Sequence, residues 1–338
     1  MIQRTPRPTH RRPTAPFILI TAPFILMMGV ALLTACGVRG TPEPTLTPEP
    51  PTATVPPSPT PVPTDTPTPT PVPPKELTIC QAQEPNTLFI YGGPSRAARH
   101  VLDAVYDGPI DRRNYALEPV ILERMPSLEE GGAALQTVFI EEGDRVLDAT
   151  GMVVELATEM TVENGAGNEV AFEGDVISMT QMVVTFTLRS DVTWADGQPL
   201  DAEDSWFSYE LASQVEDPAL QRRLDRTASY VVADAQTLVW RGVPGYVDTI
   251  YQLNFYHPLP QHVLGGTDIE QLLQTDVAQH RPLGWGPYAV ETWTPGESIT
   301  LVRNPHYFRA DEGLPHLDRV IYRFIRDPQE AVGELLTG

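Results

Sequence analysis

Marking hydrophobic and polar positions divides the chain into three zones. Residues 16–33 form the longest apolar run, and four arginines precede it. Residues 41–74 show no apolar periodicity, since 15 of these 34 positions are proline. From residue 75 onward, short apolar stretches alternate with polar turns, which is typical of a folded domain. We therefore expect three segments, at residues 1–35, 36–74 and 75–338.

The pattern within the third segment predicts both strands and helices. The β-prone run 77–80 should open a sheet. Between residues 95 and 106 the apolar positions fall at helical spacing and would bury one face, namely Ala97, Ala98, Val101, Leu102 and Val105. Residues 125–180 alternate short β-prone pieces with Gly, Asn and Asp turns, so strands and hairpins are expected there.

The strongest strand prediction covers residues 182–188, and a helix should follow it. Asp201 has the chemistry of a helix N-cap. Asp204 stands three positions later, where a side chain can accept a hydrogen bond from the backbone nitrogen of the cap residue. Acidic residues in a first turn also suit the helix dipole. This helix is expected to run through Trp206 and Leu211.

The amino-terminal pattern, four arginines and then an apolar run, is typical of an export signal. An uncleaved membrane anchor is the alternative, because the run approaches the roughly 20 residues that span a bilayer. The end of the run favours export. Leu33-Thr34-Ala35-Cys36 resembles the lipobox of bacterial lipoproteins, which implies cleavage before Cys36 and a lipid on its thiol. Such a lipid would hold the protein on a membrane without a spanning helix.

Residues 36–74 are expected to be a disordered spacer between that anchor and the folded domain. Proline fixes φ and removes backbone donors, so an extended polyproline II stalk of up to roughly 100 Å is predicted. The alternative is that this segment is a docking site for a domain with a proline-binding groove. The threonine-rich composition also permits O-glycosylation.

Charge narrows the range of partners. The chain carries 44 acidic against 23 basic side chains, a formal net charge of -21. A surface this negative repels phosphate backbones, which argues against nucleic acid as a partner. It also favours solubility outside the cell.

Two blocks of the sequence, in a fixed order, resemble one family. Residues 194–200 read Trp-Ala-Asp-Gly-Gln-Pro-Leu, and residues 284–288 read Gly-Trp-Gly-Pro-Tyr. The second block continues with Arg-Asn-Pro at 303–305 and Tyr-Phe at 307–308, and Tyr-Asp-Gly stands earlier, at 106–108. Together these motifs resemble the family 5 extracellular solute-binding proteins, the oligopeptide, dipeptide and nickel-type receptors of ABC importers.

The resemblance implies an α/β, periplasmic-binding-protein-like (type II) lobe with a mixed sheet, preceded by the signal peptide and the disordered proline-rich stalk. It implies a solute-binding protein, tethered by Cys36 to the extracytoplasmic face of the cell membrane, that passes an oligopeptide or similar small solute to an ABC permease. Residues 75–338 would be an incomplete, amino-terminal portion of the family's domain. Residues 125–180 are longer than the family's pattern and would be an added hairpin.

The resemblance also implies a cleft between two lobes that closes on the ligand. From this portion of the chain we expect Gln83, Glu84, Tyr106 and Trp285 to face that cleft, with Glu84 meeting a cationic group. Each has a plainer alternative, because buried aromatics are usually core and an acidic side chain is usually solvated. Cys80 has no partner in the chain once Cys36 carries lipid. Burial in the first strand is expected, and pairing with a cysteine beyond Gly338 is the alternative.

The sequence offers little for catalysis. There is no Gly-x-Ser-x-Gly, P-loop, His-Glu-x-x-His or Cys-x-x-Cys motif. Residues 284–289 match the letters of a dinucleotide fingerprint, but Trp285 and Pro287 would obstruct a pyrophosphate. His257 and His262 would need further ligands to hold a metal, so no metal and no cofactor are expected. An extracytoplasmic hydrolase and a non-transporting sensor lipoprotein remain the alternative functions.

Overall fold

The computed structural model describes residues 73–337 of the chain. The predicted signal peptide, the lipidation site Cys36 and the stalk up to residue 72 lie outside the described residues. The fold described below is therefore that of the third predicted segment.

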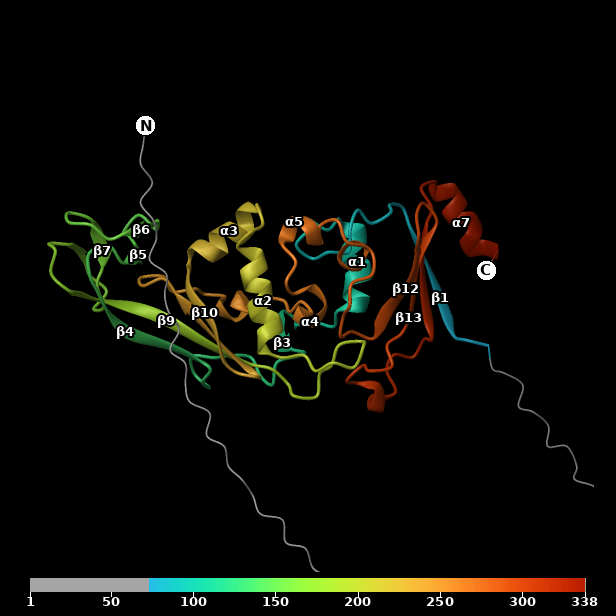
Figure 1. Ribbon diagram of the computed structural model, residues 1–338, viewed down its shortest axis with the longest axis horizontal. Helices are drawn as coiled ribbons and strands as arrows, with labels where there is room; N and C mark the ends of the chain where they lie inside the picture. Colours follow the sequence, from blue (N-terminus) through green and yellow to red (C-terminus); the bar gives the residue numbers. More distant parts are fainter. Residues whose placement is uncertain (1–72, 338) are drawn as a thin grey trace, which may run out of the picture. The chain divides into compact units, whose positions relative to one another are not determined.

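A mixed four-stranded sheet combines the two ends of this segment (Figure 1). Its strand order is β1-β14-β13-β12, formed by β1 (Glu76–Gln81), β14 (Arg319–Phe324), β13 (Ser298–Arg303) and β12 (Tyr288–Thr294). β1 runs parallel to β14, whereas the other neighbours are antiparallel. The predicted mixed sheet and the predicted opening strand are both confirmed.

A second, antiparallel sheet has the order β10-β11-β9-β4. Its strands are β10 (Thr227–Asp234), β11 (Thr237–Gly242), β9 (Ile177–Thr187) and β4 (Ala133–Ile140). β9 contains residues 182–187 of the strand predicted at 182–188 and begins five residues earlier than predicted. Short ribbons complete the β-structure: β2 (Ile110–Arg113) with β3 (Ala116–Pro119), β5 (Arg145–Leu147) with β6 (Val153–Glu155), and β7 (Thr161–Glu163) with β8 (Glu169–Ala171).

Residues 125–180 form more than one hairpin. The far ends of β4 and β9 carry the β5–β6 and β7–β8 ribbons, and together they enclose a separate small core. Its buried members are Ile140, Val146, Leu156, Val162, Phe172 and Met179. The prediction of strands and hairpins is confirmed, and the buried cluster explains why this region holds a defined fold.

Helix α1 (Arg96–Val105) follows β1 and lies beside β12 (Figure 1). Ser95 caps it, since its hydroxyl accepts a hydrogen bond of 3.2 Å from the Ala98 backbone nitrogen. The buried residues of α1 are the five predicted from helical spacing. A periodicity of 3.6 thus sufficed to place this helix and its inward face.

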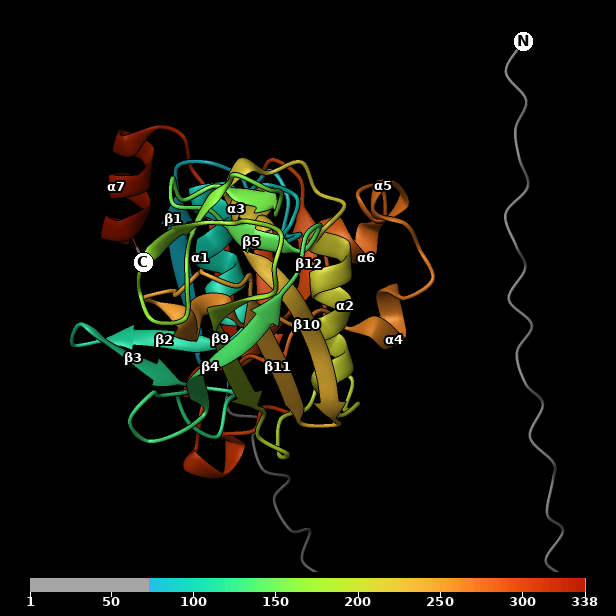
Figure 2. The ribbon, with the colours of Figure 1, turned by 90° about the vertical axis from the view of Figure 1, so that its left-hand side faces the viewer.

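Helix α2 (Ala202–Ala212) lies against β10 and β11 (Figure 2). The predicted capping box is present: Asp201 accepts from the Glu203 nitrogen at 3.0 Å, and Asp204 accepts from the Asp201 nitrogen at 3.2 Å. Asp204 is almost fully buried and also accepts from Trp194 Nε1 and the Gln261 nitrogen, each at 2.9 Å. Burial raises the pKa of Asp204 to about 6, although these donors favour its ionised form.

The remaining helices are short or peripheral. They are α3 (Pro218–Asp225), η1 (Tyr251–Asn254), α4 (Gln261–Leu264), α5 (Ile269–Leu272), α6 (Asp276–Gln279), η2 (Ala310–Glu312) and α7 (Pro328–Thr337). Within residues 73–337, none of the helices combines the length and apolar character needed to cross a bilayer.

Candidate functional site

The sequence motifs from distant parts of the chain meet in one aromatic cluster. The Trp285 ring lies 5.0 Å from Tyr106, 5.4 Å from Trp194 and 4.8 Å from His257, measured between ring centroids. Trp285 Nε1 donates a hydrogen bond of 2.8 Å to the Asp107 carbonyl oxygen. The cluster therefore ties the segment after α1 to both blocks of the family resemblance.

Burial sets the protonation of this cluster. His257 packs edge-on against Tyr106 with ring centroids 4.8 Å apart, and burial lowers the pKa of His257 to about 4. Burial likewise raises the pKa of the Tyr106 hydroxyl. Both side chains are consequently neutral near pH 7, and the cluster offers aromatic surface rather than charge.

The two glycines of the Gly-Trp-Gly-Pro-Tyr motif let the chain pass close to the end of α1. The Gly286 nitrogen donates to the Val105 carbonyl oxygen at 2.8 Å. A Cβ atom on Gly284 would lie 2.1 Å from that oxygen, and one on Gly286 would lie 2.5 Å from it. These glycines serve backbone packing, which agrees with the prediction that they are not a dinucleotide fingerprint.

The Arg-Asn-Pro and Tyr-Phe motifs also hydrogen-bond to this junction between the end of α1 and the Gly-Trp-Gly-Pro-Tyr motif. Asn304 is buried, and its Nδ2 donates to the Gly286 carbonyl oxygen at 2.8 Å. The Tyr307 hydroxyl donates to the Asp107 carboxylate. Burial, followed by this bond to Asp107, raises the pKa of the Tyr307 hydroxyl. The motifs thus form one buried framework.

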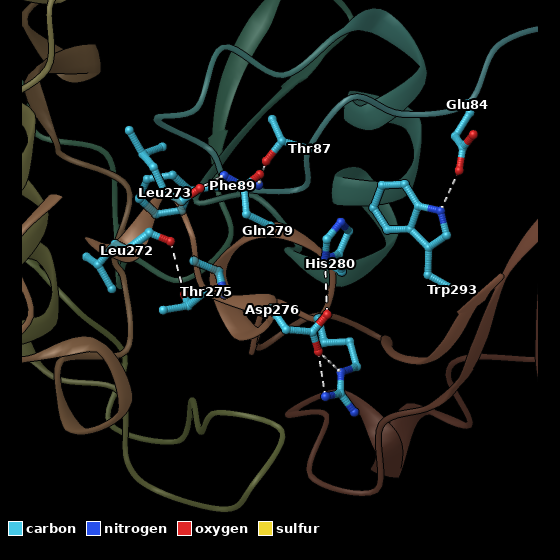
Figure 3. A network of polar contacts seen from close by, with 12 residues as sticks. Glu84, Thr87, Phe89, Leu272, Leu273, Thr275, Asp276, Gln279, His280 and Trp293 are labelled. Atoms are coloured by element: carbon cyan, nitrogen blue, oxygen red, sulfur yellow. Dashed lines mark hydrogen bonds and ion pairs between the residues drawn. The ribbon is translucent and has the colours of Figure 1, made fainter. Parts of the chain in front are cut away.

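Glu84 belongs to a different place, the loop that follows β1 (Figure 3). Its Oε1 accepts from Trp293 Nε1 on β12 at 2.8 Å and from the Gly296 nitrogen in the following turn at 3.1 Å. The carboxylate therefore holds the loop against the β12–β13 hairpin. Gln83, beside it, is exposed.

Residues at the end of α6 contact Trp293, the same tryptophan that donates to Glu84. The His280 ring lies 4.8 Å from the Trp293 ring at 86°, and His280 also contacts Asp276, as Figure 3 shows. Asp276 accepts a further bond of 2.7 Å from Arg281 Nε, which lowers the pKa of the Asp276 carboxyl. Farther along, the Leu88 nitrogen donates to the Gln279 carbonyl oxygen at 2.8 Å. The loop after β1 is thereby fixed over most of its length.

An open cavity of about 580 Å³ lies at this loop, lined by Ala82, Gln83, Glu84, Pro85 and Arg326. It brings one carboxylate and one guanidinium to the same space. Because Glu84 Oε1 takes both internal hydrogen bonds, Oε2 is left to meet a cation. Such a pair of charges suits a solute that carries both signs.

The structure separates the four predicted cleft residues into two pairs. Gln83 and Glu84 line the cavity with Arg326, whereas Tyr106 and Trp285 pack against each other in the core, at 5% and 0% exposure. Contact of any of the four with ligand stays a prediction. Sequence reasoning missed Arg326, which lines the cavity, and Trp293, which donates to Glu84. Each lies more than 200 residues from the loop in sequence and has no local signal.

Two further predictions concern cysteine and histidine. Cys80 lies in β1, is half-buried and has no disulfide partner among residues 73–337. His262 contacts the Asp196 carboxylate at 2.8 Å. In the part of the chain that the structure describes, no three His, Cys, Asp or Glu side chains are grouped so as to hold a metal ion.

Curated relatives match part of the chain. A Brucella ovis protein named for peptide binding by an ABC transporter is 30% identical over 166 residues, which is 48% of this chain and 30% of the relative. The oligopeptide-binding protein AppA of Bacillus subtilis is 28% identical over 163 residues, 45% of this chain and 28% of AppA. The matched segments thus cover less than a third of the length of these relatives.

Solved structures share the fold. The Bacillus subtilis AppA complex with a nonapeptide aligns with a TM-score of 0.55 at 19% identity, over 79% of this chain and 44% of AppA. The Thermus thermophilus oligopeptide-binding protein with a pentapeptide aligns with a TM-score of 0.52 at 18% identity, over 78% and 43% of the two chains. The predicted periplasmic-binding-protein-like fold is confirmed by these alignments.

The sequence model of the family described as bacterial extracellular solute-binding proteins, family 5 Middle, matches residues 156–338, which is more than half of the chain. That range contains the Trp-Ala-Asp-Gly and Gly-Trp-Gly-Pro-Tyr motifs that meet at Trp285. The protein belongs to the family 5 bacterial extracellular solute-binding proteins.

Proposed function

We propose that the protein is the receptor of an ABC importer, that it binds an oligopeptide or a similar small solute outside the cytoplasm, and that it passes this solute to a permease. The family match over residues 156–338 carries the proposal. Relatives named for peptide binding support it, as does a fold that AppA uses with a nonapeptide. A lipid on Cys36 would keep the receptor at the membrane surface.

The cavity at the loop after β1 is the part of this chain that we assign to the solute. A peptide carries an ammonium and a carboxylate at its ends, and Glu84 and Arg326 supply the opposite charges in one cavity. Glu84 is already oriented by Trp293 and Gly296, so binding would not have to order its side chain. Gln83 adds an amide that can donate to or accept from a peptide backbone.

The test is a thermal-shift titration of the full chain, purified in detergent, with peptides of three to nine residues. A ligand that binds only the folded protein stabilises it by about 2.7 kcal/mol at a hundredfold excess over Kd. We expect a shift that grows with peptide concentration and is absent with glucose. A flat response to every peptide would contradict peptide binding by this chain.

Two variants connect the binding to the cavity. Glu84→Gln keeps an oxygen for Trp293 Nε1 and Gly296 but removes the charge, and Arg326→Gln removes the exposed guanidinium. Both should weaken peptide binding without changing the unfolding midpoint of the free protein. Arg112→Gln, an exposed arginine on β2, is the matched control. Equal weakening in all three variants would contradict the assignment of the cavity.

The anchor is tested separately through Cys36→Ala. This variant should accumulate as unprocessed precursor or leave the membrane fraction, and it should take up no radiolabelled palmitate. Palmitate labelling that persists in the variant would exclude Cys36 as the lipidation site, without bearing on solute binding.

A further inference from the structure

Four arginines gather around α3 in a chain that has nearly twice as many acidic as basic side chains. Arg222 and Arg223 lie in the last turn of α3, Arg226 caps the helix, and Arg145 lies on β5. Figures 1 and 2 both place α3 next to the β5–β6 ribbon. None of these arginines takes part in the ion pairs of residues 73–337.

Three of them line a cavity of about 370 Å³ between α3 and the connection from β11 to η1. The other lining residues are Ala219, Trp240, Tyr246, Asp248, Ile250, Leu253 and Asn254. A second cavity of about 440 Å³ shares Arg222 and Arg226 and adds Arg145, together with Glu155 and Asp225. The smaller cavity is therefore the more strongly basic of the two.

The charge of the smaller cavity is not neutralised by its own lining. Asp248 is the one acidic residue there, against three arginines. Its two carboxylate oxygens already accept hydrogen bonds of 2.9 Å from the Ile250 nitrogen and from Asn254 Nδ2. The cavity consequently keeps an excess of positive charge and of free guanidinium donors.

Arg223 shows that donors here lack an acceptor. Its guanidinium carbon lies 3.9 Å from the centre of the Tyr256 ring, and its Nε and Nη2 are buried without a hydrogen-bond partner. The Tyr256 hydroxyl is likewise buried and unpartnered. Among the five such side-chain atoms in the described residues, three belong to this stacked pair. Buried donors without acceptors are costly, and an anion held nearby would offset part of that cost by stabilising the guanidinium charge.

A simpler explanation accounts for part of this arrangement. Cations in the last turn of a helix interact favourably with its dipole, and Arg222 and Arg223 occupy that turn of α3. The dipole does not account for Arg226 stacked 5.0 Å over Tyr246, nor for the unpartnered donors of Arg223. The helix dipole also gives no dependence on added anion, so the two explanations can be separated.

We propose that the cavity lined by Arg222, Arg223 and Arg226 binds a small anion that carries carboxylate or phosphate groups. The planar fork of each guanidinium matches such groups with paired hydrogen bonds. A volume of about 370 Å³ is that of a site for a small molecule. The site is formed by this chain alone and does not depend on the proposed peptide receptor function.

Isothermal titration calorimetry of the full chain in detergent tests the site, with citrate and inorganic phosphate as probes at fixed ionic strength. We expect saturable binding of at least one probe. Arg222→Gln combined with Arg226→Gln should weaken it at least tenfold, equivalent to about 1.4 kcal/mol. Arg223→Lys keeps the charge but loses the fork, and it should also weaken binding. Arg222→Gln alone, at an exposed position, keeps the test open if the double variant unfolds.

Arg112→Gln removes the same charge from an exposed position on β2 and is the control. It should leave the affinity within twofold. Absence of saturable binding for both probes would overturn the proposal. An equal loss of affinity in Arg112→Gln would also overturn it, because general attraction to positive charge would then explain the binding. Preference for citrate or for phosphate identifies the group recognised, and either preference supports the site.

Discussion

Gly284→Ala is the substitution for which the structure predicts the clearest loss of stability. The new Cβ would lie 2.1 Å from the Val105 carbonyl oxygen and 2.6 Å from Val105 Cγ1, so the two backbone segments would have to separate by about 1 Å to reach normal contact. Overpacking of this kind costs about 1–3 kcal/mol. Separation would also weaken the 2.8 Å bonds from Gly286 to Val105 and from Ala195 to Gly284, at about 1 kcal/mol each.

We therefore expect Gly284→Ala to lower the free energy of unfolding by about 3–5 kcal/mol, a large fraction of a typical domain's stability. Urea unfolding followed by tryptophan fluorescence measures this directly, because Trp194 and Trp285 are buried at this junction. Gly333→Ala is the matched control, since a Cβ there meets nothing within 4 Å in helix α7. It should leave stability unchanged or raise it by up to about 1 kcal/mol. A loss below about 1 kcal/mol in Gly284→Ala would refute the close-approach argument.

Three further substitutions test separate contacts by the same unfolding measurement. Asp201→Ala removes the cap of α2 and should cost about 1 kcal/mol, whereas no loss would mean that the cap is dispensable. Asn304→Ala removes the buried bond to Gly286 and should cost about 1–3 kcal/mol; a neutral result would contradict its bridging role. Burial lowers the pKa of His257 from 6.5 to about 4, so the folded state binds fewer protons than the unfolded chain below pH 6.5. The stability present above pH 6.5 is therefore partly lost as the pH falls towards 4. Through this residue, the free energy of unfolding of the wild type should fall by about 2 kcal/mol between pH 7 and pH 5. That part of the fall should be absent in His257→Gln.

Local patterns predicted the elements whose determinants are local. Helix α1 was placed to within a residue, because its determinant, an apolar repeat of 3.6 residues, is local. The capping box of α2 followed from Asp201 and Asp204 for the same reason. The pairing of β1 with β14 joins residues about 240 positions apart, and nothing in either strand specifies its partner. The small core of residues 125–180 could not be predicted either, because it depends on which face of each short ribbon turns inward.

The candidate site shows the same division. Glu84 was singled out as an acidic residue after the first strand, but its position is set by Trp293, 209 residues away. Residue type marked Tyr106 and Trp285 as large aromatics, which fits both a binding surface and a core. Their burial depends on the approach of Gly284 to Val105, a tertiary contact that a single sequence does not encode in any local pattern. Arg222, Arg223 and Arg226 belong to no recognisable sequence motif, and the cavity that they line is formed by packing against residues between 240 and 254.

The motifs that carried the family resemblance have a structural task in this chain. Gly286 and Asn304 hydrogen-bond the backbone of Val105 and the motif itself, and Trp285 donates to the Asp107 carbonyl. Side chains whose polar groups are already satisfied inside the fold have little left with which to distinguish solutes. Under the proposed function, selectivity comes from groups that the framework leaves free, such as Glu84 Oε2 and the Arg326 guanidinium in their shared cavity. For this reason the motifs identify the family without identifying the ligand, and substitutions around the cavity are the ones expected to change which solute is bound.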